Sequence, residues 1–121
     1  MKKVNFRTFV TENNTMILAG RNDANNEDLV NQADKDEEVF HTKFPGSPFV
    51  NIKGKPKKSD VKIAAIFCAK FSREWKKNKT DVEIHRFKGK DIYKTKEMKK
   101  GTFGVKKYKI IKIKKKEIEE F

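Results

Sequence analysis

Apolar side chains at helical spacing between Ser59 and Lys77 place the strongest constraint on how this chain folds. Ser59 suits the N-cap position and Asp60 suits the first turn, where the helix dipole favours an acid. The spacing predicts one amphipathic helix over about Ser59–Lys77, which must bury its apolar face against another layer. The apolar stripe consists of Val61, Ala64, Ala65, Cys68, Phe71 and Trp75.

Shorter segments on both sides of this helix carry the apolar patterns of β-strands. We expect strands over 4–10, 15–19, 38–43, 49–52, 81–87 and 102–113, with a bulge near Lys106-Lys107 in the last of them. A narrower apolar stripe after Gly20 predicts another helix over 23–33, capped by Asn22 or Asp23. The order ββ-α-ββ-α-ββ favours the α+β class, with a mostly antiparallel sheet and two helices packed on one of its faces.

The length of the chain and its content of apolar residues indicate one domain with one modest core. The chain has 121 residues, of which 36% are hydrophobic and ten are phenylalanine. We place the domain at residues 1–113 and treat residues 114–121 as a basic and acidic C-terminal tail that is frayed or adds a strand. The chain has no apolar run long enough to span a membrane and no recognisable signal peptide, so a cytoplasmic protein is expected.

Basic side chains are concentrated in the second part of the chain. The net charge is +13, and all but four of the 30 Lys and Arg residues are lysine. Residues 1–50 carry a net charge of −2, whereas residues 51–121 carry +15. Lysines cluster over 53–58, 88–100 and 106–116, and the segment Asp23–Glu38 holds seven acids. This asymmetry predicts a basic face and an acidic face, and a basic face attracts a polyanion.

Residues that often perform catalysis or bind metals are scarce. His41 and His85 lie far apart in the sequence and Cys68 is the single cysteine, so no metal, cofactor or disulfide is expected. Cys68 lies on the apolar stripe, which indicates a core thiol rather than a nucleophile. His41, just before the Pro45-Gly46-Ser47-Pro48 turn, has three open interpretations: a ring bonded to the turn backbone, an RNA contact or an acid/base catalyst. Tyr93, in the lysine-rich loop, is a candidate for stacking on a base.

Arg21 lies between a predicted strand and the start of a predicted helix. Its guanidinium, together with the free N–H groups of that helix end, suits a phosphate. Alternatively, an ion pair between Arg21 and Asp23 or Glu27 would give Arg21 a structural role in holding the helix in place. Both interpretations stay open at this point.

Four segments in order carry a family pattern: 20–27 (GRNDANNE), 40–47 (FHTKFPGS), 64–75 (AAIFCAKFSREW) and 100–103 (KGTF). Read together, they resemble the RNA-binding domain of NFACT proteins, NFACT-R. Arg21, Asn22 and Asn26 match the family's Gly-Arg-(Asp/Asn) motif and its following Asn. The other segments are similar to the family's His strand before a Gly turn, its Ala-rich helix with a Ser and an aromatic, and its Lys-x-x-Gly entry to the last strand.

The resemblance extends over about Phe6–Ile113 and implies an RNA-facing surface, with tRNA or rRNA as the first candidates. The family's domain occurs in ribosome-associated factors of translation quality control and in small stand-alone proteins, of which we expect this chain to be one. For stand-alone members the resemblance also implies a link to RNA modification. Protein partners and the oligomeric state stay open.

We therefore predict an RNA-binding module that binds structured RNA, either tRNA or rRNA, mainly through contacts between lysines and phosphates. The alternative is an RNA-modification or RNA-processing enzyme, or an accessory subunit of one, that uses His41. The predicted RNA-contacting residues are Arg21, Asn22, Asn26, His41, Lys43, Lys53, Lys55, Lys57, Lys58, Lys88, Lys90, Tyr93, Lys94, Lys96, Lys99 and Lys100.

Overall fold

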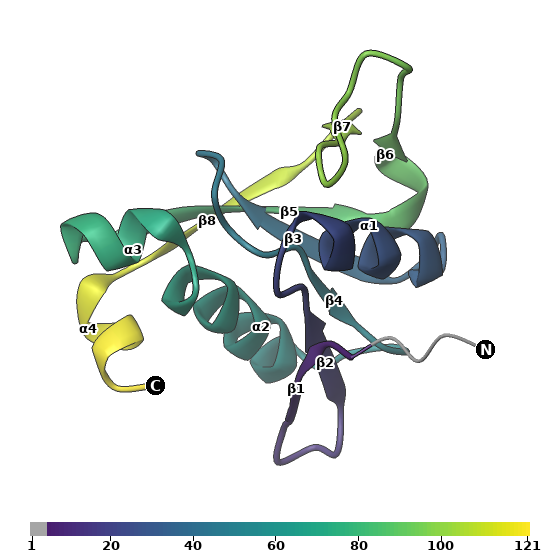
Figure 1. Cartoon of the computed structure of the whole chain (residues 1–121). Coiled ribbons are helices and arrows are strands. Elements are labelled where there is room, and N and C mark those ends of the chain that lie inside the picture. Colours follow the sequence, from purple (N-terminus) through teal and green to yellow (C-terminus); the bar gives the residue numbers. More distant parts are fainter. Residues whose placement is uncertain (1–4) are drawn as a thin grey trace.

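The computed structural model describes residues 5–121, in which one antiparallel sheet of six strands separates two helical layers (Figure 1). Its strand order is β1-β2-β4-β3-β5-β8, and β6 and β7 form a separate two-stranded ladder. This architecture confirms the α+β class; the predicted strand start at Val4 lies outside the described residues. The strands are β1 (Arg7–Val10), β2 (Met16–Ala19), β3 (Glu38–Thr42), β4 (Val50–Ile52), β5 (Val82–Lys88), β6 (Ile92–Tyr93), β7 (Gly104–Val105) and β8 (Lys109–Ile113).

The helices cover both faces of the sheet, so the prediction of two helices on one face is wrong. The α-helices are α1 (Asp23–Gln32), α2 (Lys58–Lys70), α3 (Arg73–Asn78) and α4 (Lys115–Glu119). Side chains alternate along a strand, and β3 has a buried apolar side chain on each side of the sheet. Phe40 belongs to the larger core under α2, whereas Val39 packs with Leu29 of α1 and with Phe87 in a smaller core. Each face therefore needs its own helical cover, as Figure 1 shows.

The long helix expected over Ser59–Lys77 is broken after Lys70. Ser72 is fully buried, its Oγ donates to the Ala69 carbonyl oxygen at 2.7 Å, and the same Oγ accepts the N–H of Trp75 at 3.1 Å. These bonds make Ser72 the N-cap of α3 and satisfy backbone groups at the break. The apolar period continues across the break, because Trp75 still reaches the core under α2.

The strand expected over 102–113 is divided between two ladders. Gly104–Val105 pairs with β6, and Lys109–Ile113 pairs with β5 at the edge of the main sheet. Between them the chain leaves both ladders, and Lys106 N donates to the Asp91 carbonyl oxygen at 2.8 Å. The segment expected to be a loop over 88–100 accordingly contains the 3-10 helix η1 (Gly89–Asp91) and β6.

The C-terminal segment is a helix that packs on α2, not a frayed tail or an extra strand. Ile118 of α4 is fully buried in the larger core, and Phe121 packs against the same cluster. Lys70 Nζ donates to the Ile118 carbonyl oxygen at 3.3 Å and to that of Phe121 at 3.1 Å. No helix within residues 5–121 has both the length and the apolar content needed to cross a membrane.

Because Ile118 is buried, Ile118→Ala is expected to lower the free energy of unfolding by about 3 kcal/mol, through lost burial and the cavity left behind. Urea denaturation followed by circular dichroism measures the change. Glu119→Ala, at an exposed position of the same helix, is the matched control and should change it by less than about 0.5 kcal/mol. Equal stability of Ile118→Ala and the unmodified protein would show that α4 does not contribute to the core.

Candidate nucleic-acid interface

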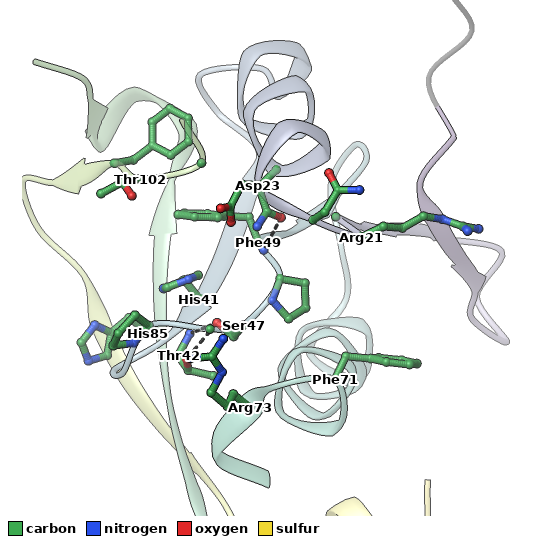
Figure 2. Close-up of a pocket in the computed structure, with 18 of the residues that line it drawn as sticks. Arg21, Asp23, His41, Thr42, Ser47, Phe49, Phe71, Arg73, His85 and Thr102 are labelled. Carbon is green, nitrogen blue, oxygen red and sulfur yellow. Dashed lines mark hydrogen bonds between the residues drawn. The ribbon is translucent and has the colours of Figure 1, made fainter. Parts of the chain in front are cut away.

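A cleft of about 710 Å³ opens beside the C-terminal end of β3 (Figure 2). It gathers four distant parts of the chain, because it is bordered by residues 20–23, 42–43, 45–48, 71, 73 and 101–103. His41 and His85, which face each other as Cα partners on β3 and β5, line the cleft. In Figure 2, Thr102 lies on one side of His41 and His85 lies on the other. We call this hollow the cleft.

The loop after β3 is fixed by short-range and long-range hydrogen bonds. Thr42 N donates to Ser47 Oγ at 3.2 Å, and the two hydroxyl oxygens lie 2.8 Å apart. Gly46 adopts a φ of 96°, and its carbonyl oxygen accepts the N–H of Arg73 at 2.9 Å. A Cβ at Gly46 would approach the Arg73 side chain within 3.0 Å, so that side chain lies directly over the loop. The loop after β3 is therefore bonded to the start of α3, and Arg73 lies at the cleft where the two meet.

Asn22 and Asn26, two predicted RNA contacts, have structural roles. Asn22 caps α1 by accepting the N–H of Asn25 at 2.9 Å. Asn26 is 6% exposed, and its Oδ1 accepts the N–H of Phe49 at 3.0 Å. A Cβ at Gly20 would overlap that amide oxygen, so glycine is required at this position. Arg21, by contrast, is exposed and shows no ion pair with Asp23 or Glu27, and in Figure 2 its side chain points away from His41.

His41 is largely enclosed in the wall of the cleft. Its ring stacks on Phe49 with 4.2 Å between ring centroids. Burial lowers the pKa of His41 to about 4, the neighbouring His85 lowers it further, and backbone hydrogen bonds at Thr42 and Ser47 act in the opposite direction. The imidazole is therefore neutral at pH 7 and has no imidazolium proton to donate as a general acid. This charge state weighs against a general acid, and the choice between a structural ring and an RNA contact stays a prediction.

The cleft is predominantly basic, although Asp23 also lines it. Arg7, Arg21 and Arg73, three of the four arginines, lie along it with Lys43 and Lys76. Arg7 is already engaged, because its Nη1 donates to the Gly20 carbonyl oxygen at 2.9 Å and its guanidinium lies over Phe71. Sequence reasoning missed Arg73 and Lys76, since both fall within a segment predicted as one continuous core helix. The rarity of arginine in a lysine-rich chain was the available signal.

Three of the predicted phosphate-binding lysines form ion pairs within the protein. Their partners belong to the acidic segment Asp23–Glu38, so part of the charge asymmetry of the sequence cancels locally on folding. The predicted separation into a basic and an acidic face is therefore incomplete. The pairs are Lys53–Glu37, Lys88–Glu38 and Lys94–Glu27, with Nζ–oxygen distances of 2.7, 2.8 and 3.1 Å.

Lys94 stabilises the hairpin formed by β6, β7 and the segment between them, which borders the cleft. Besides Glu27, its Nζ donates to the carbonyl oxygens of Lys99 at 2.6 Å and Thr102 at 2.9 Å. Glu27 also accepts the N–H of Gly101 at 2.7 Å. Partial burial raises the pKa of Glu27, but these bonds from Gly101 and Lys94 outweigh it and leave the pKa below its usual value. Lys94 and Glu27 thus fasten the lysine-rich hairpin to α1.

The other predicted lysines are exposed but fall into separate groups. Lys96, Lys99 and Lys100 lie on the hairpin that leads into the cleft wall at 101–103. Tyr93 lies over Gly104, where a Cβ would overlap its ring, and remains 43% exposed. Residues 54–58 line a second hollow, together with the acids of segment 34–38, and this hollow shares no lining residue with the cleft. The exposed lysines are Lys43, Lys55, Lys57, Lys58, Lys90, Lys96, Lys99 and Lys100.

The remaining reactive groups support no metal or thiol chemistry. Within residues 5–121, no group of His, Cys, Asp and Glu side chains could hold a metal ion. Cys68 is fully buried, and its Sγ lies 3.6 Å from the Pro48 carbonyl oxygen. Burial raises the pKa of the Cys68 thiol, so the prediction of a core thiol is confirmed.

The family profile described as the NFACT protein RNA binding domain matches residues 5–107. The match covers most of the chain, and the chain belongs to this family. Membership supports an RNA-binding role and RNA as a partner. No curated protein matches the chain.

A solved structure with the same fold is that of the C-terminal part of the fibronectin/fibrinogen-binding protein from Streptococcus suis. The TM-score is 0.84 and the sequence identity is 23%. The match covers 99% of this chain and 50% of that chain, so this chain spans about half the length of that structure. At this identity the likeness concerns the fold alone.

Proposed function

We propose that this chain binds structured RNA, either tRNA or rRNA, and that exposed basic side chains at the cleft and on its bordering hairpin contact the phosphates. The observation that carries the proposal is that Arg21, Lys43, Arg73 and Lys76 all line one cleft. Within residues 5–121 none of these four forms an ion pair with an acid. Cations that are not neutralised internally can instead bind phosphates.

The lysines and arginines of this site suit contacts with the phosphate backbone of RNA, and the arginines add a preference for phosphates in a particular orientation. Lysine offers a compact charge that attracts phosphates, whereas arginine can bind one phosphate through two parallel hydrogen bonds. Lys96, Lys99 and Lys100 extend the basic surface beyond the cleft along the hairpin. The choice of structured RNA follows from the family resemblance. The charge state of His41 does not favour the alternative of an enzyme that uses it as a general acid.

A salt titration tests the electrostatic basis of this function. The affinity for tRNA, measured by fluorescence anisotropy, is expected to fall steeply with salt because each neutralised phosphate releases counterions. Four to six phosphate contacts predict a log–log slope of about −3 to −5. A binding constant that is unchanged between about 50 and 200 mM salt would contradict the proposed mechanism. Sedimentation with purified ribosomal subunits, compared with binding to free tRNA, distinguishes the two RNA candidates.

A further inference from the structure

An exposed aromatic and aliphatic surface lies on the α1 side of the sheet, at the edge strand β8 and its neighbour β5. Tyr108 directly precedes β8. Along β8, Ile111 and Ile113 pack into the core under α2, and Ile110 points to the opposite side. Tyr108 and Ile110 are 49% and 60% exposed. Within residues 5–121, the apolar cluster under α1 does not include either of them, and α1 packs against β2 and β4.

Tyr108 is held in place by a second ring. Its ring stacks on His85 at 4.0 Å between centroids, with 13° between the ring planes. His85 Nε2 lies 3.0 Å from Glu83 Oε2, which fixes the orientation of the imidazole. One face of Tyr108 is therefore covered and half of the side chain is still exposed, so the opposite face is available. A planar surface that is already immobilised loses little conformational entropy when a partner stacks on it.

A basic groove of about 410 Å³ runs along Tyr108. Lys90, Lys107 and Lys109 line it, and all three are exposed. Two acids, Glu38 and the buried Asp91, also line the groove. Glu38 forms ion pairs with Arg86 and Lys88, whereas the three lysines form no ion pair with an acid in the described part of the chain. An exposed aromatic face beside free lysines suits a ligand that combines a flat ring with negative charge.

We propose that Tyr108, backed by His85, is a stacking platform for an unpaired nucleotide of RNA, with the adjacent phosphates in the groove of Lys90, Lys107 and Lys109. The base must be unpaired because a duplex buries the faces of its bases within its own stack. Glu83 lies on the side of the ring stack where His85 is. Because its negative charge repels phosphates, we expect the phosphates to lie on the other side, in the groove. This inference rests on the proposed function and deepens it, because it adds an unpaired, single-stranded part to the RNA that the chain is proposed to bind.

Two fluorescein-labelled probes test the platform: a single-stranded octamer of adenylate, and a blunt-ended RNA hairpin of equal charge whose two strands are joined by a non-nucleotide linker, so that all of its bases are paired. Tyr108→Ala is expected to weaken octamer binding by about fivefold to a hundredfold, the range for removing one stacking ring, and to leave hairpin binding within about twofold. Tyr108→Phe and Tyr108→Trp keep an aromatic face and should retain octamer binding. Met16→Ala is the matched control, because it truncates an apolar side chain of similar exposure on β2.

Three results would overturn the proposal. In the first, Tyr108→Ala binds the octamer as tightly as the unmodified protein. In the second, both probes lose affinity equally, which would assign Tyr108 to fold or general charge rather than to stacking. In the third, light scattering shows that Tyr108→Ala changes the oligomeric state while RNA binding is unaffected, which would make this face a contact between copies of the chain. Retained hairpin binding in the first or third case would leave the proposed function standing, whereas absence of all RNA binding by the unmodified protein would refute both.

Discussion

Asp60→Ala is expected to lower the free energy of unfolding by about 3 kcal/mol. Asp60 is 1% exposed at the first turn of α2. Its carboxylate accepts the N–H of Lys57 at 2.9 Å, the hydroxyl of Thr15 at 2.9 Å and the side-chain amide of Asn13 at 3.0 Å. One carboxylate thus joins the cap of α2 to the β1–β2 hairpin. Alanine would leave these donors without an acceptor.

The same carboxylate should produce a measurable pH dependence. Burial raises the pKa of Asp60, but the hydrogen bonds from Lys57, Asn13 and Thr15 outweigh it and lower the pKa to about 2. Because the folded pKa lies below the unfolded value of about 3.9, the stabilisation is complete above roughly pH 5 and is lost as the pH falls towards 2. Asp60→Asn should flatten this part of the stability profile by about 2 kcal/mol.

Urea denaturation at a series of pH values between 2 and 7 measures both effects. Asp36→Asn removes one exposed acid and is the matched control, and its profile should run parallel to that of the unmodified protein. If the two substitutions gave the same profile, the hydrogen bonds of Asp60 would contribute nothing specific to stability.

Helices and strands were predicted well from the sequence where they depend on the pattern of neighbouring residues. The prediction failed where they depend on contacts with residues that are distant in the sequence. The helix at α2 followed from apolar spacing, and the cap of α1 was predicted at Asn22 or Asp23, of which the structure shows Asn22. The break at Ser72 could not be predicted in this way, because the apolar period continues through it to Trp75. The helix α4 was missed because its sequence is mostly charged, and its single buried residue, Ile118, becomes informative only once α2 is known to lie beneath it.

At the candidate site, too, local patterns were predicted from the sequence and contacts between distant residues were not. A run of lysines at 88–100 correctly indicated a basic surface element, but not that Lys94 is tied to Glu27, which is distant in sequence. Asn26 matched a family position, yet its buried bond to Phe49 depends on the packing of α1 on the sheet. Arg73 reaches the cleft because Gly46 lets the loop after β3 lie against α3. Such contacts join segments that no local pattern connects.

The second large effect is expected for the RNA affinity of the cleft. Arg73→Glu combined with Lys76→Glu changes the net charge by −4 at exposed positions that line the cleft. Replacing two phosphate-binding cations by anions should weaken tRNA binding by about tenfold to a hundredfold and make the log–log salt slope shallower by about 2. Glutamate at position 73 suits the first turn of α3, whereas Lys76 lies in its last turn, where the helix dipole disfavours an acid, so the fold of the double variant is checked by circular dichroism.

The central claim is that RNA binds at the cleft rather than to the positive charge of the protein as a whole, and a matched pair of variants tests it most directly. The control is Lys115→Glu with Lys116→Glu, which makes the same change in net charge at exposed positions of α4, outside the cleft. Fluorescence anisotropy with labelled tRNA at one fixed salt concentration compares the two, with circular dichroism confirming that both are folded. The cleft variant is expected to lose at least about tenfold in affinity and the control less than about threefold. Equal losses in the two variants would contradict the account, because RNA would then respond to net charge and not to this site.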